Sequence, residues 1–159
     1  MKVRTATESD FNSILSLINA AFQVERFFKN QDRLTAADLE SYFKTGTFLV
    51  GEDEGHIVGC VYVELHGKRA YFGLLSIDPS RQKTGLGRRL VGAAEEFARE
   101  IGAHFMDLRI IHLRTELSVI YGKLGYHVTG TEPYPEQRNH MLTQPVHFIR
   151  MSKELGHRD

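Results

Sequence analysis

The amino-acid sequence predicts a mixed α/β fold in which helices flank a twisted, largely antiparallel sheet. Three short apolar runs separated by turn residues occupy positions 47–77, a pattern typical of antiparallel strands. From position 86 onward, helical and strand-like segments alternate, which favours a mixed sheet with helices on its faces. The chain has 159 residues, enough for one sizeable core, and we expect a single domain over residues 1–159.

Two helix starts carry a recognisable capping pattern. Thr7 can cap a helix while Asp10 stands three positions later, and Thr35 with Asp38 repeats this arrangement. Apolar residues at helical spacing follow each pair. The mostly polar stretch 23–33 between the two helices is interpreted as a loop or a short helix.

The strands of the first half are expected at 47–51, 57–65 and 70–77. Turn residues at 53–55 separate the first two runs and predict an antiparallel hairpin. The second half predicts a helix, a strand, a helix and two further strands. Their expected ranges are 90–101, 105–113, 116–124, 126–130 and 146–151. The segment 130–145, which contains three prolines, is expected to be irregular.

Composition excludes several classes of protein. The chain has 20 basic and 20 acidic residues, so it lacks the strong positive charge of a dedicated nucleic-acid binder. No apolar run reaches the roughly 20 residues that a membrane span requires, and no secretory signal opens the chain. The only cysteine, Cys60, cannot form an internal disulfide, which suits a reducing compartment. We therefore expect a cytoplasmic protein.

The junction after the third strand is the most informative segment. An apolar strand ends at Asp78-Pro79, and the loop Gln82-Lys83-Thr84-Gly85-Leu86-Gly87 leads directly into a helix. Glycine lets the backbone approach a ligand, and the first turn of a helix offers unpaired N–H groups and a positive dipole end. These features predict a site for a phosphate or pyrophosphate. A glycine-containing turn with solvated basic residues is the simpler interpretation, and the loop alone does not exclude it.

The common nucleotide motifs are absent from this loop. The chain contains neither the Gly-x-x-x-x-Gly-Lys-Ser/Thr loop nor a Gly-x-Gly-x-x-Gly sequence after a first strand. The eight histidines include no pair spaced as His-x-x-x-His, so we expect no metal site.

The pattern Gln82-x-x-Gly85-x-Gly87 resembles the acetyl-CoA signature of the GNAT acyltransferase superfamily. The segment 120–126, Ile-Tyr-Gly-Lys-Leu-Gly-Tyr, is similar to a second segment of that family, in which an aromatic residue stands where this chain has Ile120. The resemblance covers nearly the whole chain. It implies a GNAT-like sheet of about six to seven strands flanked by about four helices, and an enzyme that transfers an acetyl group from acetyl-CoA to an amine.

The resemblance also assigns residues to the donor site. Backbone groups of the strand end would hold the pantetheine arm, and backbone amides of the loop and helix start would hold the pyrophosphate. The first group is Leu75, Ser76 and Ile77; the second is Gln82, Lys83, Thr84, Gly85, Leu86, Gly87 and Arg88. Tyr121 would act as the general acid that protonates the leaving thiolate, although a tyrosine at helical spacing can also be a core residue.

The general base is less well defined. Relatives often carry a glutamate on the strand before the loop, but 71–77 contains no acid. Glu64, His147 and Glu25 are the candidates, and deprotonation through water is an equal alternative. Where relatives often open the second helix with asparagine, Arg114-Thr115-Glu116 stands instead. Thr115 is expected to cap that helix, and Arg114 and Glu116 either line the acceptor site or pair at the surface.

The predicted function is therefore an N-acetyltransferase whose acceptor is a primary amine on a small molecule or a protein. Its partners would be acetyl-CoA and that amine, without nucleic acid or membrane, and a homodimer is left open. The alternative is a module of the same fold that binds acyl-CoA as a regulator without turnover.

Overall fold

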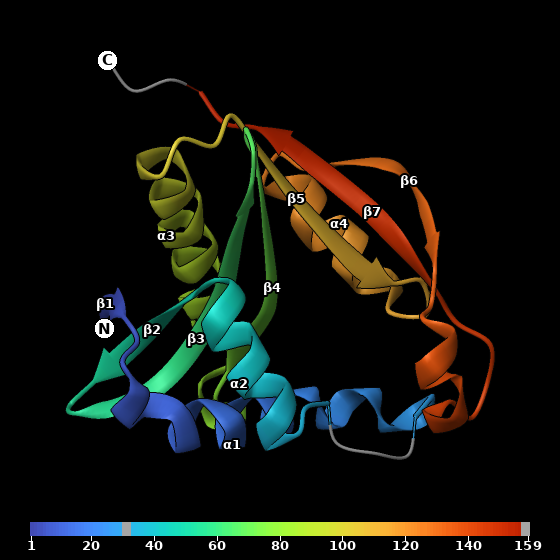
Figure 1. The fold of residues 1–159 in the computed structure, drawn as a ribbon, viewed down its shortest axis with the longest axis horizontal. Coiled ribbons are helices and arrows are strands. Elements are labelled where there is room, and N and C mark those ends of the chain that lie inside the picture. Colours follow the sequence, from blue (N-terminus) through green and yellow to red (C-terminus); the bar gives the residue numbers. More distant parts are fainter. Residues whose placement is uncertain (30–32, 157–159) are drawn as a thin grey trace.

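The computed structural model describes residues 1–29 and 33–156, and its centre is one seven-stranded sheet in the order β1-β2-β3-β4-β5-β7-β6 (Figure 1). Every neighbouring pair is antiparallel except β4 and β5, which are parallel. The strands are β1 (Lys2–Thr5), β2 (Thr47–Asp53), β3 (His56–His66), β4 (Arg69–Ile77), β5 (Phe105–Ile111), β6 (His127–Pro133) and β7 (His147–Glu154). The mixed, largely antiparallel sheet predicted from the sequence is confirmed.

In the described ranges, four α-helices and four short 3-10 helices accompany the sheet. The α-helices are α1 (Phe11–Ala21), α2 (Ala36–Thr45), α3 (Leu86–Glu100) and α4 (Thr115–Lys123). The 3-10 helices are η1 (Glu8–Asp10), η2 (Phe22–Phe27), η3 (Pro79–Arg81) and η4 (Glu136–Met141). None of the helices in the described part of the chain is long and apolar enough to cross a membrane.

Several details differ from the sequence-based expectation. The polar strand β1 was not predicted, because four residues of mixed polarity give no clear alternation. The edge strand β6 continues to Pro133, since the free side of an edge strand tolerates proline. Thr115 does not cap α4: it is the first helical residue, and the capping position belongs to Arg114, which makes no side-chain cap hydrogen bond.

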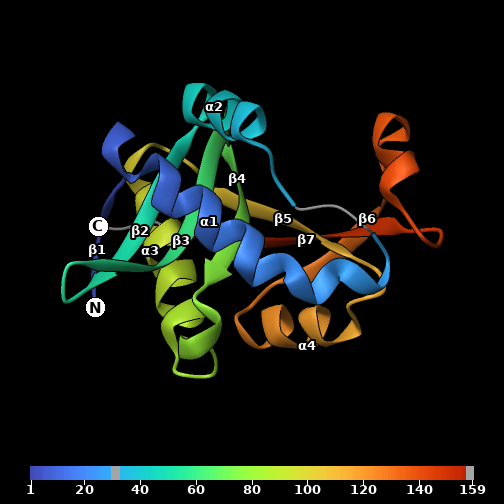
Figure 2. The ribbon, with the colours of Figure 1, turned by 90° about the horizontal axis from the view of Figure 1, so that it is seen from below.

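The helices cover the two faces of the sheet in pairs, as the view from below shows (Figure 2). One core forms between the sheet and α3 and α4, where Leu90, Ala94 and Tyr121 pack on residues such as Val61 and Phe72. The second core lies on the opposite face, between the helices α1 and α2 and the strands β2 and β3. The helices supply Ile14, Leu17, Ile18 and Leu39, and the strands supply Phe48, Val50, Cys60 and Tyr62. Alternation along β2 and β3 supplies side chains to both cores, as period-two strands require.

The N-terminal strand is tied to the start of α1 by a buried charge. The Arg4 guanidinium donates two hydrogen bonds to the Asp10 carboxylate, at 2.8 and 3.0 Å. The same carboxylate accepts a bond from the Thr7 backbone N–H at 2.8 Å, which completes the predicted capping box. These bonds, chiefly those from Arg4, lower the pKa of Asp10 from 3.8 to about 2 despite its burial.

We predict that Asp10→Asn lowers the free energy of unfolding by about 1–2 kcal/mol at pH 7, because the charge-assisted bonds to Arg4 are lost. The folded-state pKa lies below the unfolded value, so the contribution is full above pH 3.8 and disappears as the pH falls through about 2. Urea unfolding at pH 7 and near pH 2 measures both limits. The exposed Glu8→Gln serves as control and should change stability by less than about 0.5 kcal/mol; equal stabilities of Asp10→Asn and the unmodified protein at pH 7 would contradict the prediction.

Candidate active site

The site begins where β4 and β5 separate. Their parallel pairing runs only from Arg69↔Phe105 to Tyr71↔Asp107, after which the two strands diverge (Figure 1). On the other side of β4, the pairing with β3 contains a bulge in which Leu74 and Leu75 stand opposite the single residue Val61. The bulge bends β4 away from β5 and opens the sheet to a ligand.

Leu74 adopts a left-handed backbone conformation, with φ at +54°. Such a conformation costs a non-glycine residue about 1 kcal/mol or more, so packing must hold it in place. The Leu74 side chain is buried in the core under α1 and α2. The strained residue thus belongs to the structure that keeps the strands apart.

The loop after β4 leads into α3 through two left-handed residues, Lys83 at φ +64° and Gly85 at φ +86°. Gly85 is the residue before the first turn of α3, and nothing lies within 4 Å of the position where a Cβ would stand. The first backbone N–H groups of α3 have no carbonyl partner inside the helix. The predicted anion-binding geometry, a glycine turn before a helix N-terminus, is therefore present.

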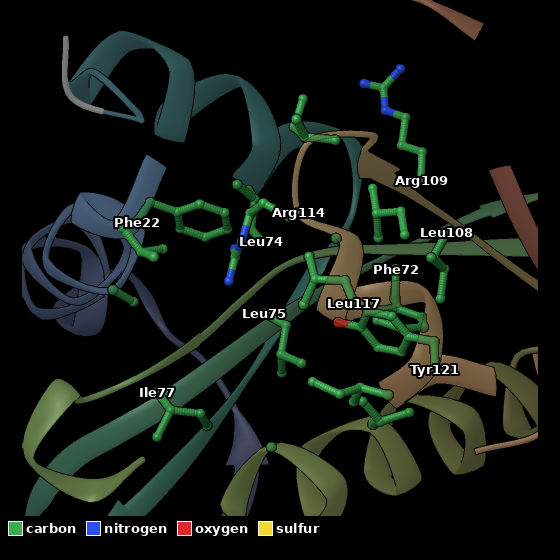
Figure 3. A pocket seen from close by; sticks show the side chains of 18 of the residues that line it. Phe22, Phe72, Leu74, Leu75, Ile77, Leu108, Arg109, Arg114, Leu117 and Tyr121 are labelled. Carbon is green, nitrogen blue, oxygen red and sulfur yellow. The ribbon is translucent and has the colours of Figure 1, made fainter. Parts of the chain in front are cut away.

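A cavity of about 760 Å³ connects this loop with the gap between the strands. Its wall includes Leu75 and Ile77 from β4, Tyr121 from α4, and side chains from η2, β5 and the segment after β6 (Figure 3). Of the residues assigned to the donor site, eight line the cavity: Leu75, Ile77, Gln82, Lys83, Gly85, Leu86, Gly87 and Arg88. Ser76 and Thr84 do not: the Ser76 hydroxyl is buried and donates to the Leu74 carbonyl, and the Thr84 hydroxyl donates to the Arg81 carbonyl.

Tyr121 projects from α4 into the cavity, and Figure 3 shows its hydroxyl directed toward the side that Leu75 lines. Its ring packs edge-on against Phe72, with the centroids 5.9 Å apart. Burial raises the pKa of Tyr121 to about 12, while the positive charge of Arg114 acts in the opposite direction. The phenol is therefore fully protonated at neutral pH and can donate a proton.

Glu25 is the only acidic residue among the described residues that line the cavity. It lies in η2, is only 5% exposed, and its carboxylate is 3.4 Å from the Lys29 ammonium and 3.6 Å from the Arg114 guanidinium. Lys29 is 4% exposed, and burial lowers its pKa to about 8 even though Glu25 favours the charged form. A buried carboxylate shared by two cations therefore forms part of the cavity wall.

Nine basic residues of the described part of the chain line the cavity beside this single acid. Three belong to the loop and the start of α3, and six come from β5, α4, η4, the segment after η2 and the residue before α4. The first set is Arg81, Lys83 and Arg88; the second is Lys29, Arg33, Arg109, Arg114, Lys123 and Arg138. Basic side chains thus lie along the wall from the loop to η4, which favours negatively charged ligands.

The two residues first considered as bases, Glu64 and His147, do not line this cavity. The Glu64 carboxylate accepts a hydrogen bond from the Tyr62 hydroxyl at 2.7 Å and lies 3.2 Å from a ring nitrogen of His66. His147 is exposed at the start of β7, with its ring stacked on that of His112 at 3.9 Å. The structure brings the third candidate, Glu25, into the cavity instead.

Sequence reasoning missed Lys29. Arg114 pairs with Glu116 at 3.2 Å, the surface alternative, and also lines the cavity, whereas Glu116 is exposed and does not line it. Lys29 reaches the cavity because its backbone pairs with Leu142 across 113 positions of sequence, a contact without any local pattern. Among the described residues, no group of three or more histidine, cysteine, aspartate or glutamate side chains is arranged to hold a metal ion.

Comparisons with known proteins agree with this geometry. Residues 11–126 match the family model described as the acetyltransferase (GNAT) family. The chain is 27% identical over 138 residues to an uncharacterized N-acetyltransferase, YhfO of Bacillus subtilis, covering 79% of this chain and 89% of that protein.

Two solved structures share the fold. The ribosomal-protein-S18-alanine N-acetyltransferase of Escherichia coli superposes with a TM-score of 0.79 at 13% identity, covering 99% of this chain and 96% of that one. The structure of yncA from Salmonella typhimurium, determined with its cofactor acetyl-CoA, gives 0.74 at 20% identity and covers 100% and 96%. The GNAT-like fold and the match to the family model agree over most of the sequence. The chain therefore belongs to the GNAT family of acetyltransferases.

Proposed function

We propose that this protein transfers the acetyl group of acetyl-CoA directly to a primary amine, in the cavity between β4 and β5. The observation that carries the proposal is that one continuous cavity reaches from the loop at Gly85 to the side chain of Tyr121. Acetyl-CoA carries its pyrophosphate at one end and its thioester at the other. A ligand with that distribution of groups matches a cavity with a helix N-terminus at one end and a proton donor further in.

The donor would be held mainly by backbone groups. The pyrophosphate would accept hydrogen bonds from the amides of Gly85, Leu86 and Gly87, with Lys83 and Arg88 adding positive charge. The pantetheine arm would lie along the bulged edge of β4 at Leu75 and Ile77, which β5 leaves without a strand partner. The backbone N–H of Ile77 would stabilise the oxyanion that forms at the thioester.

Glu25 would prepare the acceptor. An alkylammonium group has a pKa of about 10, so it must lose a proton before its nitrogen can attack. Glu25 is the acid of the cavity wall, and its carboxylate can bind the ammonium and accept that proton. The free amine then forms a bond to the thioester carbonyl carbon, and the carbonyl electrons move to oxygen.

Tyr121 would complete the transfer. When the oxyanion collapses, the carbon–sulfur bond breaks and the thiolate takes the phenolic proton. A thiolate with a conjugate pKa of about 8.5 takes a proton from a phenol only if the phenolate is stabilised or the thiolate is poorly solvated. Burial raises the pKa of Tyr121 to about 12, and the charge of Arg114 partly opposes this rise. A thiolate buried in the same cavity would also lose water, which raises its own affinity for the proton. The proton released by the attacking nitrogen finally restores the phenol through solvent, and Glu25 gives up to solvent the proton that it took from the ammonium.

We predict that Gly85→Glu weakens acetyl-CoA binding at least about tenfold, because its carboxylate would stand beside the pyrophosphate and repel it. Isothermal titration calorimetry measures the dissociation constant directly. Gly55→Glu is the matched control: Gly55 has a similar φ of +80°, equally open space and no place in the cavity wall. Similar affinities of the two variants would show that the pyrophosphate binds elsewhere.

We predict that Tyr121→Phe lowers kcat by about 10²-fold or more while acetyl-CoA affinity stays within about twofold, because only the proton donor is removed. Release of CoA thiol from acetyl-CoA, measured across a panel of amines, gives the rate. Tyr126→Phe is the control, since its ring contacts the same Phe72 but its hydroxyl donates to Glu95 in the core. Tight acetyl-CoA binding without turnover of any amine would instead favour a regulatory module.

We predict that Glu25→Gln lowers kcat/KM most strongly near pH 7 and progressively less as the pH approaches about 10, where the amine is already deprotonated in solution. The pH profile of thiol release separates this effect from a general loss of folding. Glu64→Gln is the control and should leave the profile unchanged. A loss of equal size at every pH would mean that Glu25 binds the acceptor without taking its proton.

A further inference from the structure

Among the described residues, the part of the cavity around Glu25 holds more positive charge than its one carboxylate balances. Lys29 and Arg114 share the Glu25 carboxylate, at 3.4 and 3.6 Å. Arg33 and Arg138 also line the cavity and are close enough to Lys29 for their charges to act on its ammonium. Within the described part of the wall, four cations thus share this region with one carboxylate, and two of them contact it.

The acids that pair with these cations outside the wall do not remove the excess. Arg138 lies 3.7 Å from Asp38, and the second partner of Arg114 is the exposed Glu116. Neither acid lines the cavity, so both charges act mainly from the solvent side. Neither Asp38 nor Glu116 contacts the buried Lys29 in these ion pairs. Burial disfavours the charged form of Lys29, which is why the pKa of its ammonium is lowered. The cavity therefore favours a ligand that supplies a further negative charge.

The distances set where that charge must be. A substrate ammonium bound at Glu25 would lie within a few ångströms of Lys29 and Arg114, because both cations already contact that carboxylate. An anionic group able to reach them must be separated from the ammonium by very few atoms. A carboxylate on the carbon that carries the amine satisfies this condition, and a carboxylate at the far end of a long chain does not.

We propose that the acceptor is a free α-amino acid, whose ammonium binds Glu25 and whose carboxylate binds Lys29 and Arg138, with Arg114 between the two groups. The assignment rests on the proposed acetyl transfer and adds the class of acceptor. Arg109 takes no part, since its guanidinium points away from Tyr121 in Figure 3 and contacts Glu132 at 2.6 Å.

The test compares matched acceptors in the thiol-release assay. Each of the standard amino acids is assayed beside its C-terminal amide and its decarboxylated amine; for leucine these are L-leucinamide and isoamylamine. We expect kcat/KM for the preferred amino acid to exceed that for either partner by at least about tenfold, as the loss of a charged hydrogen-bond pair implies. The amide is a strict comparison, because the pKa of its amine is near that of a peptide α-amino group, about 8, which leaves more free amine.

A second comparison tests the residues. Lys29→Met and Arg138→Gln should each lower the ratio of kcat/KM between the amino acid and its decarboxylated amine, and together bring it close to one. Lys68→Met, an exposed substitution at the β3–β4 turn, should leave the ratio unchanged. Thermal unfolding of each variant confirms that it is folded before its ratio is interpreted.

The outcomes separate this inference from the acetyl transfer itself. If amides or plain amines are acetylated as well as amino acids are, or better, the amino-acid assignment is wrong and the acetyl transfer stands. Preference for the amide would indicate a peptide N-terminus as acceptor. An unchanged ratio in the double variant overturns the roles of Lys29 and Arg138. If no amine releases thiol although calorimetry shows acetyl-CoA binding, the acetyl transfer and the amino-acid assignment both fail.

Discussion

The separation of β4 from β5 is the constraint on which the rest of this structure depends. Two parallel strands that paired along their whole length would bury the residues that here face a cavity. Pairing ends after Tyr71↔Asp107, and the bulge at Leu74 and Leu75 turns β4 away. A left-handed leucine is unfavourable by itself, so the packing of the core beneath α1 and α2 must hold it. The stability of the first half of the domain thus maintains the opening.

This arrangement lets the two faces of the sheet serve different purposes. Helices α3 and α4 pack on one face and supply the loop at Gly85 and the side chain of Tyr121. On the other side, η2 follows α1 and carries Glu25 to the cavity, while η4 approaches from the far end of the chain. The Thr143 backbone N–H donates a hydrogen bond to the Phe28 carbonyl at 2.7 Å, which holds together the segments that follow η2 and η4. The wall around Glu25 therefore depends on a contact between residues more than 100 positions apart.

Features that depend on neighbouring residues could be predicted from the sequence, and features that depend on contacts between distant residues could not. The capping pairs at Thr7 and Thr35 and the glycine loop are local patterns, and each lies where local chemistry indicated. Strand β1 was missed because its pairing with β2 decides its conformation, not its own alternation. Glu64 and His147 were considered as bases from their strand positions, but a period of two places a residue on a face and not in a cavity. Lys29 gave no signal at all, since its burial follows from tertiary packing.

A domain of this kind can change its acceptor while keeping its donor, because backbone groups would bind the donor and side chains would bind the acceptor. Recognition of a pyrophosphate by backbone amides and a helix N-terminus needs little beyond glycine at Gly85, so side chains around the loop can vary without loss of the site. The proposed recognition of the acceptor around Glu25 would use side chains alone, which come from η2, η4 and the residues next to η2 and α4. The charged side chains of this group, Glu25, Lys29, Arg114 and Arg138, belong to neither apolar core. A change at Lys29 or Arg138 would alter the charge that the acceptor meets and leave the separation of β4 and β5 intact.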